Sequence, residues 1–82
     1  SGLNELVVPA GSKAAGKKLV DLRLPGKSLI VLIARGNEYV LPSGSTSLAE
    51  GDTLLILAEK ETFDRIRSEI FTQEDEAQRL AV

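Results

Sequence analysis

Cysteine and histidine are both absent from the 82 residues of this chain. Without them the protein has no disulfide framework, no thiolate nucleophile and no imidazole to act as a base or bind a metal ion. A catalytic mechanism would have to use carboxylates, lysine, serine or the single tyrosine, Tyr39. Most metal and nucleophilic chemistry is therefore excluded, and we expect no enzyme, no catalytic residue, no metal ligand and no cofactor.

Aromatic residues are scarce, at 4% of the sequence. The core must therefore be built from leucine, isoleucine, valine and alanine. A net charge of -2 and few rings on which bases could stack argue against a nucleic-acid-binding protein. The longest aliphatic run, residues 29–34, is far shorter than the roughly 20 residues of a membrane-spanning helix. We expect a water-soluble domain with no nucleic-acid partner.

The chain has the length and composition of one small globular domain. Hydrophobic residues make up 43% and charged residues 27% of the sequence, an ordinary mixture for a folded protein. We expect a single domain over residues 1–82, with its core in residues 3–71. The tail, residues 72–82, begins with a capping pattern at Thr72 and is either a further helical turn or disordered.

The first half of the chain predicts a strand followed by a short helix. Residues 3–9 are rich in aliphatic and β-branched side chains and end at Pro9, which cannot extend a ladder. Ser12 suits the N-cap of a helix that continues to Leu22 and stops before the Pro25-Gly26 pair. Gly16 weakens this helix.

The second half predicts a hairpin, a strand and a longer helix. Residues 28–34 are continuously hydrophobic, which predicts a central strand covered on both faces. Turn residues at 35–37 predict a β-hairpin over residues 29–41, and a last strand follows at residues 53–58. From Glu59 onward, Phe63, Ile66 and Ile70 repeat with a helical period. The predicted fold is α+β, in the order strand, helix, three strands, helix, with a mostly antiparallel sheet covered by helices.

Two groups of charged residues are candidates for chemistry. Basic residues outnumber acids between residues 12 and 27, so this region is either a solvated surface or one that steers an anion. Asp21, Glu38, Glu50 and Asp52 lie near predicted turns but show no pairing that acid–base catalysis would need. Glu50 and Asp52 are interpreted as the flanks of a solvent-exposed turn. Arg35 is either exposed, or paired with an anionic ligand or with a carboxylate such as Glu38.

The order of several short motifs resembles a known family. The motifs are Pro9-x-x-Ser12, Gly16-Lys17-x-Leu19 with Leu22, Leu29-Ile30-Val31-x-Ile33-x-Arg35-Gly36, Pro42 and Leu48-x-x-Gly51-Asp52-x-Leu54. Each motif is common alone, but the ordered set over residues 3–71 resembles the TrkA C-terminal domain, also called the RCK-C domain.

The resemblance implies a regulatory module on the cytoplasmic side of the inner membrane. Such modules are attached to bacterial potassium channels, potassium uptake systems or cation/proton antiporters, and they usually pair into homodimers. An antiporter is slightly favoured because no dinucleotide-binding half precedes the domain in this sequence. Dimerisation also agrees with size, since a small aliphatic sheet gains stability when a second copy covers it.

Some relatives bind cyclic di-AMP in a groove between two subunits, and the resemblance places candidate residues around such a groove. Pro25 stands near the position of the family's arginine, and Ser28 near that of its asparagine, so the best phosphate and base donors are not matched. The ligand, a nucleotide or a cation, therefore stays unidentified. The aliphatic candidates are alternatively core or dimer contacts. The candidate ligand-binding residues are Leu19, Val20, Leu24, Ser28, Arg35 and Pro42.

A second hypothesis is a purely structural dimerisation module of a larger protein, with no ligand. Ligand-dependent stabilisation distinguishes the two, because only a sensor gains stability from a small molecule that binds its folded state. A small independent hydrolase would need a cleft with convergent polar groups, and the sequence shows no such pattern.

Overall fold

The computed structural model describes residues 2–72. The elements are β1 (Leu3–Val7), the single 3-10 turn η1 (Leu19–Asp21), β2 (Ser28–Arg35), β3 (Glu38–Val40), β4 (Thr53–Ala58) and α1 (Lys60–Glu69). The order is the predicted strand, helix, three strands, helix, except that the 3-10 turn η1 takes the place of the first helix. Of the predicted tail, all but Thr72 lies outside the described residues.

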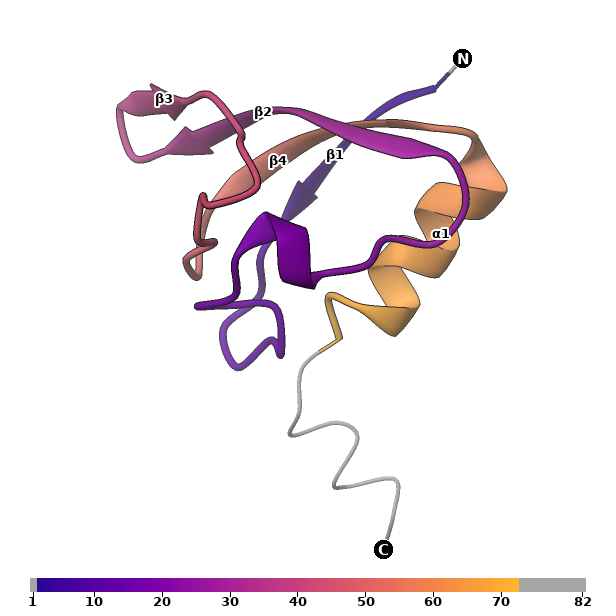
Figure 1. Ribbon diagram of the computed structural model, residues 1–82, viewed down its shortest axis with the longest axis horizontal. Coiled ribbons are helices and arrows are strands. Elements are labelled where there is room, and N and C mark those ends of the chain that lie inside the picture. Colours follow the sequence, from indigo (N-terminus) through magenta and orange to yellow (C-terminus); the bar gives the residue numbers. More distant parts are fainter. Residues whose placement is uncertain (1, 73–82) are drawn as a thin grey trace, which may run out of the picture.

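The four strands form one antiparallel sheet in the order β1-β4-β2-β3 (Figure 1). The predicted hairpin is confirmed: β2 turns at Gly36 and pairs with β3, with Ile33 opposite Val40 and Arg35 opposite Glu38. β1 returns to the sheet on the far side of β4, where Leu6 lies opposite Leu54. The α+β fold class with an antiparallel sheet is therefore confirmed.

The core lies on one face of this sheet. Figure 1 shows α1 and η1 on the same side of the strands. Ile33, Leu54 and Ile56 of the sheet and Ile66 of α1 belong to one core cluster and are fully buried, at 0% exposure each. The helical period predicted from Glu59 places Ile66 on the face of α1 that is buried in the core. The two-residue period of β4 likewise places Leu54 and Ile56 on the buried face of the sheet.

The opposite face of the sheet is open in the described chain, which corrects the prediction that residues 28–34 are covered on both faces. Leu3, Leu57 and Leu29 lie side by side across three strands and keep 59%, 48% and 59% of their surface exposed. A continuous hydrophobic run predicts a strand covered on both faces. Here α1 and η1 both pack on one face, so the other apolar face has no cover among residues 2–72.

The first predicted helix is also corrected, because residues 12–22 contain only the turn η1. Gly16 adopts φ +86°, outside the right-handed helical region, and its N–H donates to the Leu48 carbonyl at 2.7 Å. The N–H groups of Leu19 and Val20 donate to Thr46 and Gly44 carbonyls at 2.9 and 3.1 Å. Bonds to a distant segment replace the helical hydrogen bonds. Ser12 still acts as a local cap, since its Oγ accepts from Ala14 N at 3.1 Å.

No helix within residues 2–72 has the length and apolar character needed to cross a membrane.

Candidate functional site

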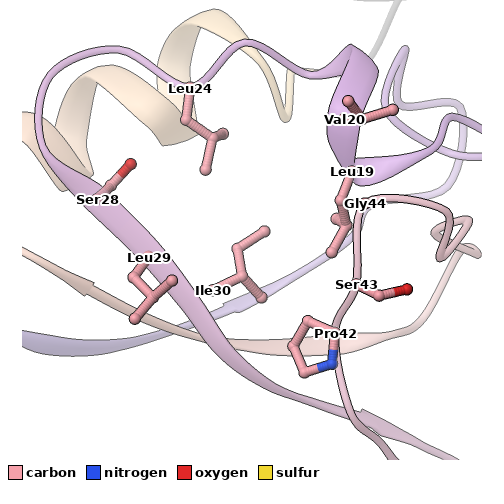
Figure 2. A pocket seen from close by; sticks show the side chains of 9 residues that line it. All are labelled: Leu19, Val20, Leu24, Ser28, Leu29, Ile30, Pro42, Ser43 and Gly44. Atoms are coloured by element: carbon pink, nitrogen blue, oxygen red, sulfur yellow. The ribbon is translucent and has the colours of Figure 1, made fainter.

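A cavity of about 340 Å³ lies between η1, the start of β2 and the segment that follows β3. Figure 2 shows Leu24, from the loop before β2, and Ile30, from β2, pointing toward one another across it. Apolar side chains dominate the lining, and the polar groups are two serines and the backbone. The lining residues are Leu19, Val20, Leu24, Ser28, Leu29, Ile30, Pro42, Ser43 and Gly44.

Backbone hydrogen bonds hold the two walls of the cavity together. One wall is η1 and the other is the segment from Pro42 to Gly44. They are joined where Val20 N donates to the Gly44 carbonyl at 3.1 Å, and Leu19 N donates to the Thr46 carbonyl at 2.9 Å. Thr46 also closes a tight turn, because its Oγ1 accepts from Ser43 N at 3.0 Å. The cavity therefore has a shape defined by the backbone rather than by side chains alone.

Five of the six candidate ligand-binding residues line this one cavity. They are Leu19, Val20, Leu24, Ser28 and Pro42. The lining also includes residues that were not among the candidates, namely Leu29, Ile30, Ser43 and Gly44. Leu29 and Ile30 are the two residues after Ser28, and Ser43 and Gly44 are the two residues after Pro42, so closeness in sequence was the signal that could have found them.

Arg35, the sixth candidate, lies outside the cavity lining and pairs with Asp52 instead. Its Nε and Nη2 donate to the two carboxylate oxygens at 2.8 Å each, and Nη2 also donates to the Ser47 carbonyl at 2.9 Å. This bidentate geometry suits a guanidinium and a carboxylate. The carboxylate partner is therefore Asp52, not Glu38, which lies opposite Arg35 on β3.

The interpretation of Asp52 as the flank of a solvent-exposed turn is wrong, because the Asp52 side chain is only 1% exposed. Its Oδ2 also accepts from Ala49 N at 2.9 Å, closing the turn that leads into β4. The hydrogen bonds from Arg35 lower the pKa of the Asp52 carboxyl below its ordinary value, against the opposing effect of burial. They raise the pKa of Arg35 in turn. We call this Arg35–Asp52 pair, with its bonds to Ser47 and Ala49, the ion-pair clip.

The chemistry of the cavity suits binding rather than bond cleavage. None of its nine lining residues is ionisable. The buried carboxylate of Asp52 is already occupied by Arg35 and Ala49, and residues 2–72 contain no cluster of three carboxylates that could hold a metal ion. Aliphatic walls with two hydroxyls and exposed backbone are typical of a site for a flat or apolar group oriented by a few polar contacts.

Basic residues flank the cavity in the chain without lining it. Lys18 precedes Leu19, Arg23 precedes Leu24 and Lys27 precedes Ser28, and all three cations are exposed. Arg23 adopts φ +53°, a left-handed conformation that is uncommon outside glycine. Part of the basic region expected between residues 12 and 27 therefore alternates in sequence with residues that line an apolar cavity.

The model of the TrkA-C domain family matches residues 3–70, nearly the whole described chain. The chain belongs to the TrkA-C, or RCK-C, family. This is a family of regulatory domains. The chain is 40% identical over 65 residues to a Trk system potassium uptake protein TrkA homolog from Archaeoglobus fulgidus. The match covers 79% of this chain but only 15% of that relative, which is a far longer protein.

Solved structures of RCK-C domains share the fold. An RCK domain solved with cda superposes with a TM-score of 0.77 at 30% identity, over 85% of this chain and 99% of that one. The RCK C domain of the potassium transport protein KtrA, in complex with cyclic diadenosine monophosphate, gives 0.73 at 27% identity, over 83% and 81% of the two chains. The RCK_C domain dimer of Streptococcus agalactiae BusR with c-di-AMP also gives 0.73, over 83% and 93%, and at 18% identity it shares the fold alone.

Proposed function

We propose that this chain is a non-catalytic ligand-sensing and dimerisation domain of a bacterial monovalent cation transport system, potassium or sodium/proton. The observation that carries the proposal is the cavity, because residues that are far apart in the chain converge on a preformed apolar pocket beside three exposed cations. A sensing site needs this combination of a shaped pocket and a field that attracts its ligand.

The ligand that fits these walls best is a nucleotide. A purine base can lie between Leu19, Leu24 and Pro42, while the hydroxyl of Ser28 and the backbone of Ser43 supply hydrogen bonds. Phosphate groups would sit outside the apolar walls, near the basic flanks. The KtrA domain and BusR, which share this fold, were solved with cyclic di-AMP. That dinucleotide is therefore the first probe to use.

We propose that the domain works as a homodimer. Its larger partner would be the parent transport protein, and the domain would lie on the cytoplasmic side of the inner membrane. The described chain leaves an apolar cavity rim exposed at Val20 and Leu29, which a second copy can cover. The BusR domain of similar fold is described as a dimer. A BusR structure with promoter DNA matches over 34% of that chain at 18% identity, so it supports the fold and not a DNA contact of this domain.

Thermal unfolding with and without ligand tests the sensing proposal. We expect cyclic di-AMP to raise the midpoint, since a ligand at 100 times its Kd stabilises the folded state by about 2.7 kcal/mol. AMP, ATP, potassium and sodium are the comparison probes.

A pair of matched variants locates the site. Val20→Asp places a carboxylate on the cavity wall and should abolish the shift, whereas Val7→Asp on β1 should keep it. Both valines are exposed, at 66% and 55%, so neither change disturbs the core. If none of the probes raises the midpoint of the wild-type protein, the sensing proposal fails and a purely structural dimerisation module remains.

A further inference from the structure

The segment of residues 41–47, between β3 and β4, carries one wall of the cavity but is itself a surface segment. None of its residues is buried, and Leu41 is 80% exposed. The chain packs against the core at Val40 on one side of this segment and at Leu48 on the other. Between those two points, hydrogen bonds must hold the wall in place.

Most of these hydrogen bonds lead to another surface segment rather than to the sheet. Leu19 N and Val20 N donate to the carbonyls of Thr46 and Gly44, and η1 itself contains no buried residue. A β-carbon built on Gly44 would lie 3.5 Å from the β-carbon of Val20, so the two walls are also in contact. The two walls therefore form one surface unit. We call η1 and residues 41–47 together the wall unit.

Arg35 is the residue that ties the wall unit to the sheet. Among residues 2–72, the bond from Arg35 Nη2 to the Ser47 carbonyl, at 2.9 Å, is the one hydrogen bond between a strand and the wall unit. Nε and the same Nη2 also bind the two carboxylate oxygens of Asp52. Two parallel bonds to a carboxylate fix the plane and the direction of a guanidinium. Asp52 therefore directs Nη2 toward Ser47.

We infer that Arg35 is a positioning residue for the cavity, because the ion-pair clip fixes the wall unit relative to β2. The facing side of the cavity includes Ser28, Leu29 and Ile30 of β2, so the width of the cavity depends on where the wall unit lies. Neither Arg35 nor Asp52 lines the cavity, and their effect on a ligand is indirect. The inference deepens the proposed function and rests on it for the ligand.

The clip and a ligand in the cavity should support each other. Without the clip, the wall unit can leave its place, and the fraction of molecules with a formed cavity falls. The apparent affinity for a ligand falls by the same fraction. The coupling is reciprocal, so a bound ligand should also hold the wall unit more firmly against the sheet.

A double variant removes the link without leaving a buried charge. Arg35→Met alone would leave the Asp52 carboxylate buried without its cation, which can destabilise the whole fold. Arg35→Met combined with Asp52→Asn avoids this charge, and the asparagine amide oxygen can still accept from Ala49 N. The polar contact that the wall unit loses in this double variant is the bond to Ser47.

Amide hydrogen exchange, measured residue by residue by NMR, tests the positioning without any ligand. The N–H groups of Leu19 and Val20 report on the wall unit, and those of the ladder between β1 and β4 report on the whole fold. In the double variant we expect exchange at Leu19 and Val20 to accelerate about tenfold relative to the ladder. A general loss of stability would not raise this ratio.

Arg65→Met is the matched control. It removes the same charge from an exposed ion pair, with Glu69 on α1, and Arg65 lies outside the cavity lining. Its exchange ratio should equal that of the wild-type protein. Isothermal titration with cyclic di-AMP should give a Kd about tenfold higher in the double variant. In Arg65→Met the Kd should stay within about twofold of the wild-type value.

Two results would overturn the inference. One is an exchange ratio that is the same in the double variant and in the wild-type protein. The other is an unchanged Kd in a double variant whose wall unit exchanges faster. If the wild-type protein does not bind cyclic di-AMP, the sensing proposal fails for this ligand, while the exchange ratio still decides whether Arg35 fixes the wall unit.

Discussion

The two ends of strand β2 show how one short hydrophobic strand serves two purposes. At its carboxyl end β2 has a neighbour on both sides, and Arg35 is held by Asp52 and Ser47 in the ion-pair clip. At its amino end Ser28 and Leu29 have one neighbouring strand, an apolar cavity and solvent. The carboxyl end, here called the closed end, is held by strands on both sides and by an ion pair, and the amino end, the open end, provides the surface on which binding is proposed.

The difference follows from the length of β3. β3 has three residues, so it covers only the end of β2 nearest the hairpin turn. After Pro42 the chain leaves the sheet and turns back along η1, bonded through Gly44 and Thr46. A longer hairpin would pair β3 with residues 28–32 of β2, next to the cavity. The short hairpin leaves this part of β2 without a second neighbouring strand among residues 2–72.

The closed end should be the more sensitive to substitution. Asp52→Ala removes the acceptor for Ala49 N and for Arg35, and leaves the part-buried N–H of Ala49 without this partner. We expect a loss on the order of 2 kcal/mol in the free energy of unfolding, measured by urea denaturation. Glu69→Ala removes the exposed ion pair with Arg65 and should change stability by less than about 0.5 kcal/mol. Equal losses in both variants would contradict the importance of the clip.

Two glycines that flank β2 allow a closer comparison. Gly26, before the open end, and Gly36, after the closed end, have nearly equal positive φ values of 63° and 60°. A β-carbon at Gly26 would meet Thr62 of α1 at 3.1 Å, whereas one at Gly36 meets nothing within 4 Å.

Comparing the two alanine variants therefore separates the free-energy cost of a left-handed backbone from the cost of the clash with Thr62. Gly36→Ala should cost about 1 kcal/mol from the left-handed backbone alone. Gly26→Ala should cost more, because Thr62 must also move, and urea denaturation of the two proteins side by side gives the difference. A smaller loss for Gly26→Ala would mean that Thr62 does not hold the loop before β2 against α1.

The smallest effect at neutral pH is expected from titration of the clip. The pKa of Asp52 is lower in the folded protein than its ordinary value of 3.8, so its contribution is complete above that value. Stability from this group is lost as the pH falls below about 4 and through the folded pKa. Unfolding curves between pH 7 and pH 2.5 should show a steeper acid loss for the wild-type protein than for Asp52→Asn. Parallel pH profiles would show that other carboxylates dominate.

The pattern of the sequence was sufficient to place the sheet and its helix. The strand at residues 53–58 and the hairpin turn at Gly36 agree with the structure. The helix predicted from Glu59 begins at Lys60. These elements were predictable because alternation, turn residues and helical period act over a few neighbouring residues.

The site was predictable in part, through the resemblance to the family. It placed Leu19, Leu24 and Pro42 around one groove, and the structure brings them together around one cavity. The helix expected around Gly16 was wrong because hydrogen bonds to Leu48 and Thr46, some thirty residues away, outweigh local helix propensity. Short-range pattern contains no information on such partners.

What the amino-acid sequence determined by itself is an aliphatic α+β domain without histidine or cysteine. The tertiary structure alone decided that Asp52 is buried and paired with Arg35. It also decided that, among residues 2–72, the first half of β2 has a neighbouring strand on one side only and borders a cavity. The physical reason is the distance along the chain over which each effect acts. Propensity and periodicity act between neighbouring residues, whereas burial, ion pairing and the pairing of strand edges depend on which distant segments the fold brings together.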